Sequence, residues 1–243
     1  MSDAFYLSDD EVVVLLGLCH GTVAYGIESK LFSHWQRQDQ QMVKDLMNRL
    51  QSRDLISLDY HGVVHMKKGL YDLLQVMKAP TELLSLKTVL FSGEKETYFY
   101  YKKDGMLYEM KRGEFLHRFQ EVQTIPLFEG KTMQLHELLT KEDIDYVNES
   151  IDNFDEWEAM DYLESHTSSP TLVMDIIEKK YDETVVEYFA WKDAKLFHQK
   201  QITVGKMNQE LFECVTTDRG LEFQGGASLA NHIIQTMIKG GML

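Results

Sequence analysis

The sequence predicts an α+β fold, in which an N-terminal winged-helix-like module precedes an antiparallel sheet with flanking helices. Apolar residues recur at helical spacing before residue 80, alternating aromatic-rich segments begin at about residue 86, and helical spacing returns over residues 131–164. These three observations carry the prediction. The expected parts are residues 1–82 for the module and 83–243 for the sheet region, which we expect to pack as one unit with halves of about 86–164 and 170–243.

The module is expected to begin with a helix over residues 8–19. Ser8 is a favourable N-cap residue, and Glu11 follows three positions later, which is the spacing of a capping box. A second helix is expected over 38–53, where apolar residues recur at spacings of three and four. Two short apolar segments around Asp59–Gly62 then predict a hairpin, and a third helix is expected to close at Pro80.

The order helix, helix, hairpin, helix is the plan of a winged-helix module, which either binds DNA or serves as a structural or protein-contact unit. Residues 30–80 contain eight Lys and Arg against five Asp, so this segment is locally basic. DNA readers need several cations for phosphates and Arg, Asn or Gln aimed at base edges. The second helix offers few such side chains, which makes nucleic acid the less favoured partner.

Antiparallel strands are expected in two blocks, each followed by a helix. The strand segments of the first block are 87–92, 96–103 and 106–119, and those of the second block are 171–180, 183–191, 194–204 and 211–217. An Asp-Gly pair after Lys103 favours a tight hairpin. A closing helix is expected over 228–238. Residues 96–112 and 183–201 share a Glu-Thr start and a Lys-Asp turn, so the two blocks are either a pseudo-repeat or similar only in strand composition.

Charge limits the classes of partner. The 243 residues carry 39 Asp and Glu against 25 Lys and Arg, a formal net charge of −14. Because phosphates and anionic lipids repel such a chain, the balance disfavours nucleic acid and membrane surfaces. No apolar run is long enough to span a membrane, so no membrane insertion is expected. The N-terminus lacks the basic start and apolar run of a signal peptide, and we expect a cytoplasmic protein.

Motifs for catalysis are missing from the sequence. It contains no GxSxG elbow, no HExxH and no phosphate-binding loop, and its two cysteines are expected to be buried thiols. His61 and His65 share a face if they lie in a strand, but no further ligands stand at metal-site spacing. Gly225 and Gly226 could offer backbone N–H groups to an anion or simply begin a helix. We predict a protein that is not an enzyme, with no catalytic residues, no cofactor and no metal.

Residues 142–164 contain ten Asp and Glu and no Lys or Arg. This acidic helix is either a solvated face or a surface that meets a basic partner, since such a surface speeds association and selects partners. Asp152 and Asp155 stand at i,i+3 spacing, where a cation could bridge them. The candidate partner-binding residues of this segment are Asp152, Asp155, Glu156 and Trp157.

Aromatic residues of the first strand block form a second candidate surface. Tyr98, Tyr100 and Tyr108 are expected on one alternation of the hairpin, and Phe99 and Tyr101 on the other. One face should belong to the core. If the other face is exposed, its tyrosines bind a protein partner, because Tyr is common at interface hot spots; otherwise helices cover both faces.

The layout resembles that of the EspG-like substrate chaperones of type VII secretion systems. The resemblance rests on YLSDDEVVVLLGLCHG at the N-terminus, GLYDLLQVMKAP at the end of the module and the aromatic hairpin ETYFYYKKDGMLYEM, and it extends over nearly the whole chain as architecture. It is nearest to the EsaE-like members of Firmicutes, which hold an antibacterial toxin before export. The resemblance implies a cytoplasmic, non-enzymatic protein that binds a secreted substrate or toxin.

The leading hypothesis is therefore a cytosolic binding protein, a chaperone or accessory factor for a type VII secretion substrate. It would shield an apolar surface of the substrate until export. The alternative hypothesis is a winged-helix transcription regulator with a C-terminal sensing domain.

Overall fold

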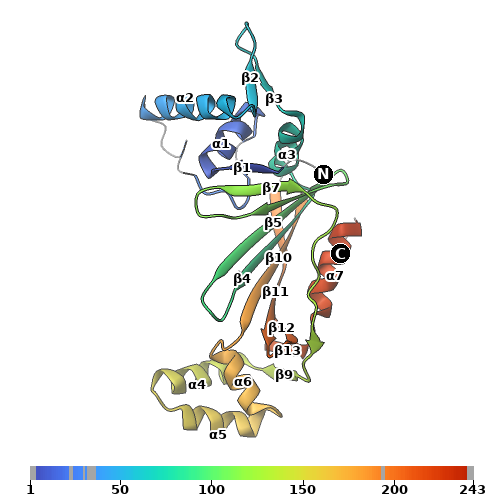
Figure 1. Cartoon of the computed structure of the whole chain (residues 1–243). Coiled ribbons are helices and arrows are strands. Elements are labelled where there is room, and N and C mark those ends of the chain that lie inside the picture. The colour runs from blue at the N-terminus through green and yellow to red at the C-terminus, as the bar shows by residue number, and fades with distance from the viewer. Residues whose placement is uncertain (1–3, 22–23, 30, 32–36, 193–194, 240–243) are drawn as a thin grey trace. The chain divides into compact units, whose positions relative to one another are not determined.

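The computed structural model describes residues 4–21, 24–29, 31, 37–192 and 195–239 (Figure 1). These residues form an α+β fold with a large, mainly antiparallel sheet, as the sequence predicts. Two compact units divide the chain. The first unit is Met1–Leu84, Tyr98–Thr124 and Phe189–Phe197, and the second is Ser85–Thr97, Ile125–Tyr188 and His198–Leu243. Four strands contribute residues to both units: β4 (Glu82–Val89), β5 (Lys95–Lys103), β10 (Asp182–Lys192) and β11 (Lys195–Met207).

The first unit begins with a strand that the sequence did not predict, β1 (Phe5–Leu7). The predicted succession follows: α1 (Asp9–Leu18), α2 (Arg37–Ser52), β2 (Ile56–Leu58), β3 (Val64–Met66) and α3 (Lys68–Lys78). The predicted capping box is confirmed, because the Glu11 amide donates to Ser8 Oγ (3.3 Å) and the Ser8 amide donates to Glu11 Oε2 (3.0 Å). The winged-helix character of this module stays a prediction, as does a domain boundary at residue 82.

The sheet of the first unit pairs β1, β7 (His117–Glu121), β6 (Met106–Lys111) and β5 in that order, all antiparallel. Asp104 and Gly105 join β5 to β6, and both have positive φ angles of 50° and 79°. This is the backbone of a tight hairpin turn, for which Asp-Gly is a favoured pair. Apolar side chains of α1 and α3 pack on one face of these strands and form the core of the unit.

The second unit pairs β11, β12 (Glu210–Thr217), β13 (Gly220–Gly225) and β9 (His136–Leu139) in antiparallel order. The short β8 (Lys131–Thr132) runs parallel to β12. Its helices are α4 (Lys141–Asp152), α5 (Glu156–His166), α6 (Pro170–Ile177) and α7 (Ser228–Lys239). The helices α4, α5 and α6 share an apolar core with Phe212 of β12 and Phe223 of β13.

The expectation of a helix from residue 131 is wrong for its first ten residues. Leucines at 135, 138 and 139 suit a helix by spacing, but residues 136–139 pair with β13 as β9. Hydrogen bonds to a distant strand therefore override a local pattern here. The strand β13 follows a turn at Asp218 and Arg219 and was not expected from the sequence.

The strand expected over 171–180 is also wrong, because Pro170–Ile177 forms α6. A short apolar run does not distinguish a buried strand from a buried helix by its periodicity alone. Pro170 occupies the first turn of the helix, where its missing N–H costs nothing. Val173, Met174 and Ile176 are buried in the core of the second unit.

The pseudo-repeat remains a prediction. The turn expected at Asp193 lies outside the described residues, so the structure offers no comparison with the Asp104 turn.

Candidate functional site

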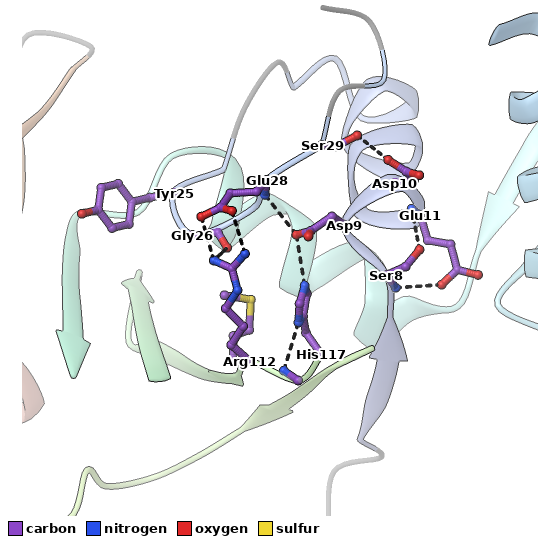
Figure 2. A network of polar contacts seen from close by, with 12 residues as sticks. Ser8, Asp9, Asp10, Glu11, Tyr25, Gly26, Glu28, Ser29, Arg112 and His117 are labelled. Carbon is purple, nitrogen blue, oxygen red and sulfur yellow. Dashed lines mark hydrogen bonds and ion pairs between the residues drawn. The ribbon is translucent and has the colours of Figure 1, made fainter. Parts of the chain in front are cut away.

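A polar network in the first unit ties the segment after α1 to the sheet (Figure 2). Asp9 Oδ1 accepts from the Glu28 amide and lies 3.0 Å from His117 Nε2. The Gly113 amide donates to His117 Nδ1 at 3.2 Å, so the ring proton is placed on Nε2 and points at Asp9. Arg112 pairs with both carboxylate oxygens of Glu28 at 3.0 Å, and this contact lowers the pKa of Glu28.

This network has the Asp–His pair that many catalytic sites contain, but its geometry suits a structural role. The His117 side chain is 2% exposed and both of its ring nitrogens are hydrogen-bonded. A general base needs a ring nitrogen within reach of the substrate proton that it takes. We therefore interpret the Asp9–His117 pair as a structural contact that holds residues 24–29 close to β7.

The predicted tyrosine surface is divided between two faces of the sheet. Cross-strand pairs place Tyr98 and Tyr100 opposite Lys111 and Glu109, whereas Tyr108 lies opposite Tyr101. Directly opposed residues share a face, so the expected grouping of Tyr108 with Tyr98 and Tyr100 is wrong. The observed pairing of β6 with β5 is shifted by one residue from the pairing that would put the three tyrosines on one face. The Asp104-Gly105 turn sets this register.

Burial separates these tyrosines further. Tyr108 belongs to the core face, with Phe99, Tyr101 and Met110, and burial raises its pKa to about 12. Tyr100 is also buried, and its hydroxyl donates to Glu109 Oε2 at 3.0 Å. Burial and that carboxylate raise the pKa of Tyr100 well above its ordinary value. Of the three tyrosines, only Tyr98 is not buried. Its ring stacks on that of Tyr100, and the ring centroid lies 5.0 Å from Lys111 Nζ.

Glu109 has further partners on the same face. Its Oε1 accepts from the Arg118 guanidinium at 2.9 Å and from Gln120 Nε2 at 3.0 Å. The second face of β5, β6 and β7 is thus polar and built around one carboxylate.

The acidic segment 142–164 is two helices rather than the single helix expected. The helix α4 ends at Asp152, and α5 begins after Asp155, whose side chain accepts from the Glu158 amide and caps the helix. Asp152 and Asp155 therefore do not share a helix face, and the cation bridge based on i,i+3 spacing loses its geometric basis. Asp152, Asp155, Glu156 and Trp157 are all exposed.

A ladder of stacked rings joins the two helices. Tyr146 of α4 stacks on Tyr162 of α5 at 4.4 Å between centroids, and His166 also stacks on Tyr162, at 3.9 Å. The Tyr146 hydroxyl donates to Glu158 Oε1 at 2.6 Å, and the Tyr162 hydroxyl donates to Asp143 Oδ1 at 2.5 Å. Each tyrosine thus reaches a carboxylate, and the pKa of Tyr162 rises to about 12 mainly through its bond to Asp143.

Acid is expected to weaken this helix pair through Asp143. Hydrogen bonds from Tyr162 and Thr140 outweigh burial and lower the Asp143 pKa, so the carboxylate adds stability that is present above about pH 4 and lost as pH falls through its folded-state value. In Asp143→Asn this acid-dependent loss should be smaller, and the capping box of α4 should weaken by about 1 kcal/mol. Urea unfolding of both proteins between pH 3 and pH 7 measures the difference. Equal pH dependence would show that Asp143 does not contribute.

The second unit also contains a cleft of about 760 Å³. Its apolar walls come from α4, α6, β12 and β13, and its polar rim includes the exposed β11 residues His198 to Gln201. Cys214 lines the cleft, and burial with the nearby Glu183 raises its pKa to about 12. A thiol with a raised pKa is a poor nucleophile, so covalent chemistry at Cys214 itself is disfavoured.

A carboxylate of the protein itself, that of Glu213, lies at the start of α7, just after the glycine pair Gly225 and Gly226. Glu213 is fully buried, and its two carboxylate oxygens accept from the Leu229 amide (3.1 Å) and the Ala230 amide (2.6 Å). These are N–H groups of the first turn of α7, the groups that would bind a phosphate. An external anion at this helix start would compete with Glu213, a partner that sequence spacing did not reveal.

In the described ranges, no three His, Cys, Asp or Glu side chains gather as a metal site would require. His65 Nε2 lies 3.3 Å from Asp59 Oδ2, while the His61 ring contacts the Tyr60 ring at a tilt of 43°. Among the helices that the structure describes, none is long and apolar enough to cross a membrane.

Comparisons with known proteins identify the fold. No protein-family model matches the sequence, and no curated protein matches it. The structure is similar to that of the type VII secretion system chaperone EspG5 of Mycobacterium tuberculosis, solved in complex with a PE25–PPE41 dimer. The TM-score is 0.63 at 10% sequence identity, and the match covers 98% of this chain and 96% of the other. The chain therefore has an EspG-like fold, that of a type VII secretion chaperone.

Proposed function

We propose that this protein is a cytosolic, non-enzymatic chaperone or accessory factor for a type VII secretion substrate, of the EsaE-like Firmicute kind that holds an antibacterial toxin. The observation that carries the proposal is the likeness of fold to a secretion chaperone along nearly the full length of both chains. A likeness confined to one unit would be less informative, since small α+β units serve many functions.

The mechanism requires surfaces that hold an apolar part of the substrate away from water until export. The cleft of the second unit offers apolar walls for this purpose. Exposed acidic residues at the end of α4 and the start of α5 would attract a basic substrate and discourage unspecific binding of the apolar surfaces.

The proposed contacts are drawn from the candidate residues that are accessible. Tyr98 offers a ring beside Lys111 on the polar sheet face, and Asp152, Asp155, Glu156 and Trp157 lie exposed in the second unit. Tyr100 would support Tyr98 by stacking beneath it. Tyr108 is part of the core, so we leave it out of the surface.

The expected result is a stable complex with an export substrate encoded beside the gene. The two purified proteins, mixed at micromolar concentrations, should elute together from gel filtration and earlier than either alone. Separate elution of the two proteins would remove the basis of the proposal. A gel shift with the DNA upstream of the gene, weakening steeply as salt rises, would instead support a winged-helix regulator.

A further inference from the structure

Two large aromatic side chains lie in solvent where α4 gives way to α5. The side chain of Phe154 is 96% exposed, and that of Trp157 is 84% exposed. They stand three positions apart in the chain, with Trp157 in the first turn of α5. Single exposed apolar residues are ordinary on protein surfaces, but two almost fully exposed rings so close in sequence point to a binding surface.

The backbone makes Phe154 a costly choice for its position. Its φ angle is +61°, in the left-handed region that favours glycine and disfavours side chains with a bulky Cβ substituent. The Phe154 amide donates to the Ile151 carbonyl (2.9 Å), and the Asp155 amide donates to the Ser150 carbonyl (2.9 Å). These bonds end α4 in the manner that usually places glycine at this residue.

The fold does not depend on either ring. Val147 on α4, together with Ala159 and Leu163 on α5, is buried and anchors the helix pair in the core of the unit. The tyrosine hydroxyls that reach Asp143 and Glu158 connect the two helices on the surface. Phe154 and Trp157 therefore add exposed apolar area, and Phe154 adds backbone strain, while both side chains stay almost fully exposed.

The acidic residues near these rings indicate the charge of a partner that would cover them. Asp152, Asp155 and Glu156 lie within two residues of one or other ring in the chain, all exposed, and none forms an ion pair with a residue that the structure describes. The whole segment 142–164 holds ten acids and no cation. A partner that buries the rings must also meet this negative rim, so cations are expected around its apolar contact.

We propose that Phe154 and Trp157 form a protruding anchor that inserts into an apolar groove of the export substrate, with Lys and Arg of the substrate around the groove. This inference rests on the proposed function and specifies the contact surface and the chemistry of the partner. Trp is enriched at interface hot spots, and the backbone of Trp157 is already held in the first turn of α5, so less of its conformational entropy is lost on binding than from a loop.

The test compares binding and stability in the same variant. Phe154→Gly should unfold at an equal or higher temperature than the wild type, because glycine relieves the strained φ angle. With the neighbouring export substrate as the probe, Phe154→Gly combined with Trp157→Ala should bind at least about tenfold more weakly in calorimetry. Phe115→Ala removes a similarly exposed ring, 77% exposed, in the first unit and should bind as the wild type does.

Charge is tested separately with Asp152→Asn combined with Glu156→Gln, which leaves the Asp155 cap in place. Association should slow, and its salt dependence should become less steep, while the rings remain. Wild-type binding that the Phe154 and Trp157 changes leave unaltered would overturn this inference and leave the proposed function standing. Failure of the wild type to bind the substrate would overturn both.

Discussion

The Glu213→Ala variant is expected to lose about 3 kcal/mol of stability, because two charge-assisted hydrogen bonds to the α7 amides disappear at about 1.5 kcal/mol each. The carboxylate is fully buried, so water does not replace it at the Leu229 and Ala230 amides. Gln224 Nε2, which donates to Glu213 Oε2 at 3.0 Å, loses a partner as well. A chain of this length should then show a midpoint about 6–12 °C lower in thermal unfolding.

Glu222→Ala is the matched control, since Glu222 lies exposed on the neighbouring strand β13 and should change stability by less than about 0.5 kcal/mol. Glu213→Gln should fall between the two, because an amide retains one acceptor oxygen but presents a donor to the helix start. Hydrogen exchange of the α7 amides should accelerate in Glu213→Ala. Unchanged exchange there would show that Glu213 does not hold the helix.

Gly225→Ala should be comparably damaging, for a steric reason. A Cβ atom added at Gly225 would lie 1.7 Å from the Met133 carbonyl oxygen, which is backbone and has no rotamer to adopt. The Gly225 amide donates to the Leu135 carbonyl at 2.8 Å, so the two backbones are held together at the place where the methyl group must go. We expect a loss of about 3 kcal/mol, the upper end of the range for overpacking.

Gly17→Ala is expected to increase the stability of the protein rather than lower it. Gly17 lies in α1, nothing would lie within 4 Å of its added Cβ, and alanine is favoured over glycine in a helix by up to about 1 kcal/mol. Urea unfolding of both variants distinguishes the two cases. If Gly225→Ala unfolds at the same urea concentration as the wild type, the segment from Met133 to Leu135 does not approach β13 as described.

The contacts tested by Glu213→Ala and Gly225→Ala explain why the sequence left two interpretations of the glycines before α7. From the sequence, Gly225 and Gly226 fit a plain helix start better than an anion site, because no P-loop pattern follows them. The choice depends on Glu213 and Met133, which lie 12 and 92 positions earlier in the chain. Contacts at such separations are tertiary, and no local spacing encodes them.

Elements with complete local signals were predicted well. The Ser8–Glu11 capping box, the amphipathic α2, the Asp104-Gly105 hairpin and the closing helix all follow from interactions between residues close in sequence. The acidic segment was predicted as helical but not as two helices, because Phe154 stands where glycine would have marked the break. The aromatic hairpin was predicted with its strands in place but with Tyr108 on the wrong face, since register depends on how many residues the turn takes.

By itself, the sequence determined the class of the fold, most helices and strands, and the candidate acidic and aromatic residues. Periodicity, capping and turn chemistry act over a few residues, and composition needs no coordinates at all. Only the tertiary structure decided that residues 136–139 are a strand, that 170–177 is a helix, and that Tyr100 and Tyr108 are buried while Trp157 and Phe154 are exposed. Burial and strand pairing depend on partners far along the chain, so they become visible only when those partners are in place.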